Sequence, residues 1–392
     1  MFELVRFLLR VSYYYALLVG VLNFEIDLRT GRARITKRTS IYAACVNVIC
    51  ICGLPWLSGT HVIHSFWSQA ELLHDYMFLV MLSGRILCVS VTLISRWSQR
   101  RRFVRLVNSL HHLTQQKPHV MRMWRRGVIS KFMSVILSDL LQMAASLLLI
   151  WEKLTIQLSF SVMIFYAISA LVNIIISHYY FALLNVYGQY ILINRELRAV
   201  LAETRSLESE CRKGVFIIKC CSLADRLEAI GNTQFQLQIL IQHLTNCFGL
   251  QALLLTISYY MSGVSMIYLG FSELTGAIRL NWSKWVLALL GCGFICYFTD
   301  IHISVNIIYA LLDAHAEMVK LLSQHTLFAP GLDERLAAVF DSFQLQLAWN
   351  PLKFSVLGLY DMEKSNAVTL ASSVVTSSLV LIQNDLKNAY LY

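Results

Sequence analysis

Seven side chains within the apolar runs of this 392-residue chain have the chemistry to bind a small organic molecule. One of them is a charge, Arg85, and charges inside apolar runs are costly and usually functional or paired. The other six are aromatic, and aromatic walls with a few polar groups suit an organic ligand. The predicted ligand-binding residues are Arg85, Phe165, Tyr166, Tyr259, Tyr260, Phe294 and Tyr297. The alternative for each of them is ordinary packing between membrane spans.

A carboxylate in the following apolar run offers Arg85 a structural role instead. Arg85 and Asp139 both fall near the middle of the membrane if the two runs cross it in opposite directions. An ion pair between them and a ligand-facing Arg85 are therefore two open interpretations. Asp300 and His302 lie nearer the cytoplasmic end of a later run, where a structural polar cluster is predicted.

The histidines do not predict a metal centre or an enzyme. They occur in two sparse groups, His111, His112 and His119, and then His315 and His325, without partner carboxylates at ligand spacing. A phosphate-binding glycine loop and a nucleophile elbow are both missing from the sequence. We therefore expect no metal, no cofactor and no catalytic residue.

The last apolar run, from Asn366 to Asn384, is rich in small hydroxyl side chains. Thr369, Thr376 and Gln383 recur every seven residues and fall on one face of a helix. Lipid offers such a face no hydrogen-bond partner, whereas the water in a pore or the backbone and side chains of a closely packed helix can bind the hydroxyls. Tight packing without a pore is the remaining alternative.

The composition predicts an all-α membrane protein that must position these side chains. Hydrophobic residues make up 57% of the chain and charged residues 14%, against about 25% charged in soluble domains. The apolar runs are too continuous for a β-barrel. Seven transmembrane helices are predicted, at Ile41–Leu57, Tyr76–Ser95, Phe132–Trp151, Phe160–Phe181, Phe248–Leu269, Trp285–Ile308 and Ala367–Ile382.

The N-terminal stretch Phe2–Phe24 is apolar but contains Arg6 and Arg10. Two arginines and the lack of a small-residue cleavage site argue against a signal peptide. We predict an amphipathic or re-entrant helix there, with an eighth span as the alternative.

The placement of Lys and Arg predicts the orientation. Counted by loops, 26 basic residues fall on one side of the seven spans and four on the other, so the positive-inside rule puts the N-terminus in the cytoplasm and the C-terminus outside. This is the reverse of a G-protein-coupled receptor. The sequon at Asn281, a predicted glycosylation site, falls on the outside. The net charge of +10 reports this topology and predicts no nucleic-acid partner.

The longer polar stretches fall on the cytoplasmic side and have helical spacing, so we expect them to extend the spans into one helical bundle. The predicted division is a cytoplasmic N-terminal segment (1–40), six spans with their extensions (41–310), cytoplasmic anchor helices (311–366), the seventh span (367–384) and an extracellular tail (385–392).

The C-terminal residues resemble the signature of insect gustatory receptors. The matching residues are Leu345-Gln346-Leu347, Pro351, Phe354, Gly358, Tyr360, Thr376 and Gln383. Ser377 stands where that signature has Tyr, and Asn384 where it has Phe, which suggests a divergent member.

The resemblance implies a chemosensory cation channel of four subunits, identical or mixed, in the plasma membrane of a gustatory neuron, at its dendrite or cell body. In the family the seventh span lines the pore, and small organic tastants enter an outward-facing pocket among spans two to six. Bitter compounds are the default class. The pore-lining residues implied here are Thr369, Ser372, Ser373, Thr376, Leu379, Val380 and Gln383.

Two other functions stay open. The first is a non-conducting partner subunit that modifies or traffics other gustatory receptors. The second is a seven-span transporter or G-protein-coupled receptor, which would require a cytoplasmic C-terminus.

Overall fold

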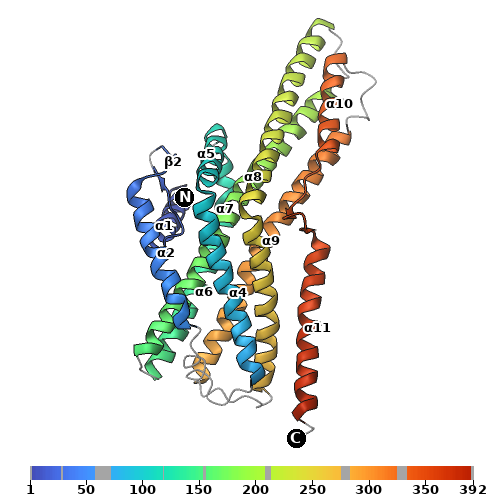
Figure 1. Cartoon of the computed structure of the whole chain (residues 1–392). Coiled ribbons are helices and arrows are strands. Elements are labelled where there is room, and N and C mark those ends of the chain that lie inside the picture. Colours follow the sequence, from blue (N-terminus) through green and yellow to red (C-terminus); the bar gives the residue numbers. More distant parts are fainter. Residues whose placement is uncertain are drawn as a thin grey trace.

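The computed structural model describes residues 2–27, 30–57, 72–117, 119–152, 156–207, 213–274, 283–324 and 333–389. Within these ranges the chain is helical, with two short antiparallel hairpins, so the all-α prediction is confirmed (Figure 1). The elements are α1 (Phe2–Leu18), β1 (Glu25–Ile26), β2 (Ala33–Arg34), α2 (Lys37–Leu57), α4 (Leu72–Ser98), α5 (Arg100–Gln116), α6 (Val120–Glu152), α7 (Ile156–Ser206), α8 (Lys213–Leu274), α9 (Lys284–Ser323), α10 (Glu334–Trp349), β3 (Ser355–Val356), β4 (Tyr360–Asp361) and α11 (Lys364–Ala389).

Each of the seven predicted spans lies in a helix of its own, namely α2, α4, α6, α7, α8, α9 and α11. Among the described residues, α6, α7, α8, α9 and α11 are long and apolar enough to cross a membrane. The other two, α2 and α4, border residues 58–71, which lie outside the described ranges. The Phe2–Phe24 stretch forms α1, which packs one face, with Val5 and Leu8, into the core and contacts α6 and α7.

Helix α7 lies at the centre of the bundle and contacts α1, α2, α4, α5, α6, α8 and α9. A helix in this position cannot hydrate its polar side chains, so they need partners on neighbouring helices. Asn173 donates to the Asp139 carboxylate of α6 at 2.7 Å. Further along α7, Asn185 donates to Thr114 Oγ1 at 2.9 Å, and Gln189, one turn after Asn185, donates to the Leu113 carbonyl at 3.2 Å. Both acceptors are on α5.

The predicted helical extensions are confirmed as continuous helices. With 51 and 62 residues, α7 and α8 are about 77 Å and 93 Å long at ~1.5 Å per residue. A hydrocarbon core of about 30 Å cannot contain them. The end of α7, the start of α8, the end of α9 and α10 project together beyond α11 at the top of Figure 1.

The projecting bundle has the burial pattern of a water-soluble helical domain. Its interior is apolar, with Leu227, Leu311 and Phe340 fully buried. Its surface has exposed ion pairs such as Arg226–Glu203 at 2.6 Å and Arg335–Asp225 at 2.6 Å. In contrast, helix α2 exposes apolar residues such as Ile41 and Ile49, as expected for a surface that faces lipid.

A tight hairpin, β3–β4, connects α10 to α11. Its turn has Leu357 at φ 54° and Gly358 at φ 74°, closed by a 3.0 Å hydrogen bond from Leu359 N–H to the Val356 carbonyl. Two consecutive positive φ values are the requirement of a type I′ turn. Glycine adopts this conformation freely, whereas a leucine there costs roughly 1–2 kcal/mol. The side chain of Leu357 packs against Gly249 of α8, where an added Cβ would lie 3.2 Å from Leu357 Cδ2.

A buried ion pair joins α6 to α9. Lys131 Nζ lies 2.5 Å from Asp300 Oδ2 and 2.7 Å from Ser304 Oγ, and the lysine side chain is fully buried. The polar cluster predicted at Asp300 therefore exists, and its partner is Lys131, which lies one residue before the predicted span Phe132–Trp151. His302 is exposed and takes no part in it.

Replacing only one member of this pair is expected to destabilise the protein. Lys131→Met or Asp300→Leu leaves an uncompensated buried charge, at a cost on the order of 3–5 kcal/mol. The double variant Lys131→Met/Asp300→Leu restores most of that loss because two apolar side chains replace two charges. Unfolding of the purified chain in detergent measures all three variants. Additive losses in the double variant would contradict a direct pair.

Candidate functional site

Three of the predicted ligand-binding residues come together from three helices. Arg85 of α4 lies with its guanidinium carbon 5.7 Å from the ring centre of Tyr297 of α9. The Tyr297 ring packs edge-on against Tyr259 of α8 at 5.3 Å between ring centres. A cation over an aromatic face contributes about 0.5–2 kcal/mol, depending on solvent exposure. This cluster is the part of the predicted set that combines a charge with an aromatic wall.

Arg85 does not pair with Asp139. The Asp139 carboxylate accepts hydrogen bonds from Asn173 at 2.7 Å and from the Tyr15 hydroxyl at 3.3 Å. Arg85 donates from Nη1 to Ser169 Oγ at 3.4 Å, and Gln142 donates to the same oxygen at 3.0 Å. The ion-pair interpretation is therefore wrong, because amide and hydroxyl donors bind Asp139 in place of the arginine.

The other predicted ligand residues that the structure describes make different contacts. Tyr166 lies beside Tyr15 of α1, and Phe294 packs against Phe298 at 4.5 Å between ring centres. Tyr260 contacts α11. The side chain of Phe165 and the sequon at Asn281 lie outside the described residues.

The seven residues predicted to line the pore, here called the stripe, lie on an exposed face of α11. They are Thr369, Ser372, Ser373, Thr376, Leu379, Val380 and Gln383. All seven residues of the stripe are exposed in the single subunit, and Leu379 and Val380 keep 52% and 59% of their surface accessible. The hydroxyls of Thr369 and Thr376 donate to the helix's own carbonyls four residues back, at 3.0 Å and 2.9 Å. Their oxygen lone pairs therefore remain available on that face.

The opposite face of α11 packs along α8. Ser378 is fully buried and Ile382 is 8% exposed. An added Cβ on Gly263 of α8 would lie 3.1 Å from Val374 Cγ1, so the two helices approach closely there.

One side chain of α8 reaches across to α11. The Tyr260 hydroxyl lies 2.7 Å from Ser377 Oγ and 3.3 Å from Ser373 Oγ. Ser377 is the position at which the gustatory receptor signature has Tyr, and the small serine leaves room for the Tyr260 ring.

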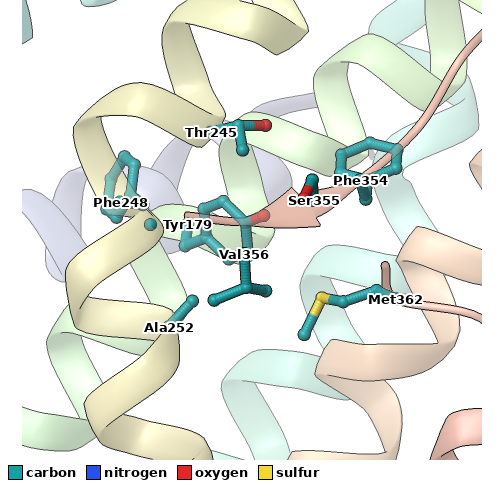
Figure 2. A pocket seen from close by; sticks show the side chains of 9 residues that line it. Tyr179, Thr245, Phe248, Ala252, Phe354, Ser355, Val356 and Met362 are labelled. Atoms are coloured by element: carbon teal, nitrogen blue, oxygen red, sulfur yellow. The ribbon is translucent and has the colours of Figure 1, made fainter. Parts of the chain in front are cut away.

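The β3–β4 hairpin is packed onto α7 and α8 below a very small cavity. Figure 2 shows Val356, Phe354 and Met362 gathered around it, facing Tyr179 and Phe248. The cavity volume is about 10 Å³, which is at most the room of one water molecule. It cannot hold an organic ligand, so this region is a packed joint between α8 and the segment that leads into α11.

Two contacts fix the base of α11 beside this joint. The Tyr360 hydroxyl donates to Thr256 Oγ1 of α8 at 3.1 Å, and Lys364 Nζ lies 2.8 Å from Asp313 of α9. The signature residues Phe354, Gly358 and Tyr360 therefore share one task, which is to attach the last helix to its neighbours.

The chain is similar over nearly its full length to insect gustatory receptors. Gustatory receptor 59d of Drosophila melanogaster is 38% identical over 393 residues, covering 99% of this chain and 100% of the relative. Gustatory receptor 36a of the same species is 35% identical over 394 residues, with 99% and 100% coverage.

The fold is similar to that of a solved insect olfactory receptor, OR5 from Machilis hrabei. The TM-score is 0.66 at 12% identity, covering 97% of this chain and 99% of that receptor. The structure of OR5 in complex with eugenol gives a TM-score of 0.61 at 13% identity, with 97% of each chain covered.

The family model described as 7tm Chemosensory receptor matches residues 9–388. Together with the relatives, which are receptors and not enzymes, this match confirms the resemblance that the C-terminal residues indicated. The chain therefore belongs to the 7tm chemosensory receptor family and is a multi-pass membrane protein related to insect gustatory receptors.

Proposed function

We propose that the protein is a subunit of a ligand-gated cation channel that detects small organic tastants. The observation that carries this proposal is the two-sided character of α11. One face is packed on α8, and the opposite face, with the seven-residue stripe, is left exposed by its own subunit. In a tetramer with the C-terminus outside, that face would meet the central axis and line a pore, with Leu379 and Val380 as an apolar ring.

The proposed ligand site is centred on Arg85, Tyr259 and Tyr297, in the outer half of the bundle. Such a site suits an aromatic or polar organic molecule because it offers ring faces and a fixed cation. The complex of OR5 with eugenol supports this ligand class for the shared fold. The similarity to gustatory receptors supports a taste function in the plasma membrane of a gustatory neuron, with bitter compounds as the proposed class.

Ligand binding has a short physical route to the proposed pore. Tyr259 belongs to the ligand cluster, and the next residue, Tyr260, contacts Ser373 and Ser377 of α11. A rotation or shift of this part of α8 would therefore move a side chain that already touches the last helix.

A non-conducting partner subunit is the second candidate. The departures at Ser377 and Asn384 from the gustatory receptor signature favour it. Expressed alone, such a subunit would give no ligand-evoked current, but it would change the response of a co-expressed gustatory receptor.

The pore proposal predicts water access on one face of α11. Thr376→Cys is expected to react with a charged thiol reagent and to lose most of its ligand-evoked current, because a wetted thiol ionises and reacts. Ser378→Cys is the matched control, two residues away on the buried face, and should not respond. Currents recorded with and without the reagent measure both, with the unsubstituted chain as baseline. Equal protection of the two positions would exclude a pore along this stripe.

The ligand-site proposal predicts a graded series at Tyr297. In a screen of small organic compounds with eugenol as one probe, Tyr297→Ala should raise the half-maximal concentration of an active compound about tenfold, which corresponds to about 1.4 kcal/mol. Tyr297→Phe keeps the ring face over Arg85 and should stay within about threefold. Arg85→Ala should lower the response more than it lowers surface expression. Unchanged dose–response curves at normal surface expression would move the site elsewhere.

A further inference from the structure

A second cavity, of about 270 Å³, lies apart from the proposed ligand site. Residues of α1, β1, α4, α5, α6, α7 and α8 enclose it, and none of the seven predicted ligand residues lines it. Its lining includes Arg96, Phe181 and Phe248, which stand at the predicted cytoplasmic ends of spans two, four and five. The cavity thus belongs to the inner-leaflet end of the bundle in the proposed orientation.

The cavity is lined by a buried arginine that has no anionic partner in the described part of the chain. Arg96 is 4% exposed, and its Nε and Nη2 atoms make no hydrogen bond. Its guanidinium carbon lies 4.0 Å from the ring centre of Phe103 and 5.0 Å from that of Phe248. Arginine stays charged in proteins, and a buried charge without a counter-charge is strongly unfavourable. Two aromatic faces compensate only a part of that cost.

The other residues that line the cavity add buried polar atoms without partners. Trp124 Nε1, His178 Nδ1 and Asn185 Oδ1 belong to lining residues, and each is buried without a hydrogen-bond partner. The described lining contains no Asp or Glu. Such a site attracts an anion and disfavours a cation.

Most of the remaining lining is apolar, apart from the hydroxyl residues Ser12 and Tyr13. Leu9 of α1, Leu106 of α5 and Val128 of α6 contribute aliphatic surface. The volume lies just below the range of about 300–1,000 Å³ that is typical of small-molecule sites. It suits one short aliphatic chain and leaves no room for the two chains of a membrane phospholipid.

We propose that this cavity binds a single-chain amphiphile with an anionic head, namely a fatty carboxylate. The carboxylate binds the Arg96 guanidinium through charge-assisted hydrogen bonds, and the aliphatic chain lies among the leucines and valines of α1, α5 and α6. Lysophosphatidate has the same chemistry, a single chain with an anionic head, and it is the alternative source of the ligand.

The test measures binding and not current, so its outcome is independent of the proposed channel function. The full-length protein is placed in phosphatidylcholine nanodiscs, and binding of labelled decanoate is compared with competition by decanol and decylammonium. Decanoate should bind saturably, and both competitors should be at least tenfold weaker because they lack the anionic head. Arg96→Gln should weaken decanoate at least tenfold and leave decanol unchanged. Arg101→Gln, an exposed arginine of α5, should bind as the unsubstituted protein does.

A second variant keeps the charge and removes the space. Ala182→Trp fills the cavity from α7 and should abolish decanoate binding while Arg96 is intact, which covers the case in which Arg96→Gln does not fold. Equal affinities for decanoate and decanol, or a normal affinity in either Arg96→Gln or Ala182→Trp, would overturn the proposal. Tight binding of single-chain lysophosphatidate without binding of decanoate would also overturn the carboxylate assignment and identify the lipid source.

Discussion

The fold depends on how a helix surrounded by other helices satisfies its polar side chains. In the described part of the chain, helix α7 contacts seven other helices, and its buried side-chain amides donate to Asp139 of α6, Thr114 of α5 and the Ala314 carbonyl of α9. An interhelical hydrogen bond contributes only about 0.6 kcal/mol in a membrane and about 0.5–1.5 kcal/mol in a water-soluble domain. Leaving a buried polar group unpaired costs about 1–3 kcal/mol in a water-soluble domain and several kcal/mol in a membrane. These contacts therefore determine which face of each neighbour is turned toward α7 more than they add stability.

The sequence was sufficient for the outline of this fold because the outline follows from local patterns. Long apolar runs located the seven helices, and helical periodicity in the polar stretches located their extensions. Local sequence patterns do not identify which side chain is the partner of an individual charge. Counting residues gave Arg85 and Asp139 a similar depth, but depth does not say in which direction around the helix axis a side chain points. Lys131 follows a basic run and lies just outside the predicted span Phe132–Trp151, yet it is buried against Asp300.

The candidate site was predicted in part for the same reason. Consecutive residues of a helix point about 100° apart, so the neighbours Tyr259 and Tyr260 cannot serve one cluster. The first faces Tyr297 and the second faces Ser377 of α11. Only the packing of α8 against both helices decides this division. The role of Gly358 was likewise invisible until its positive φ explained why the gustatory receptor signature has a glycine there.

Because α11 is attached at its base, the β3–β4 hairpin is the point about which this helix can tilt. Its base is held by Lys364 and by the hydrogen bond from Tyr309 to the Glu363 carbonyl, whereas the residues of the stripe stay exposed, with a contact from Tyr260 of α8 at Ser373. Gln383 lies 19 residues beyond Lys364, a distance of roughly 28 Å along the helix axis. A tilt of about 5° at the pivot would therefore displace Gln383 by roughly 2.5 Å. In the proposed channel, a small tilt at the hairpin would thus produce a much larger displacement at the far end of the helix.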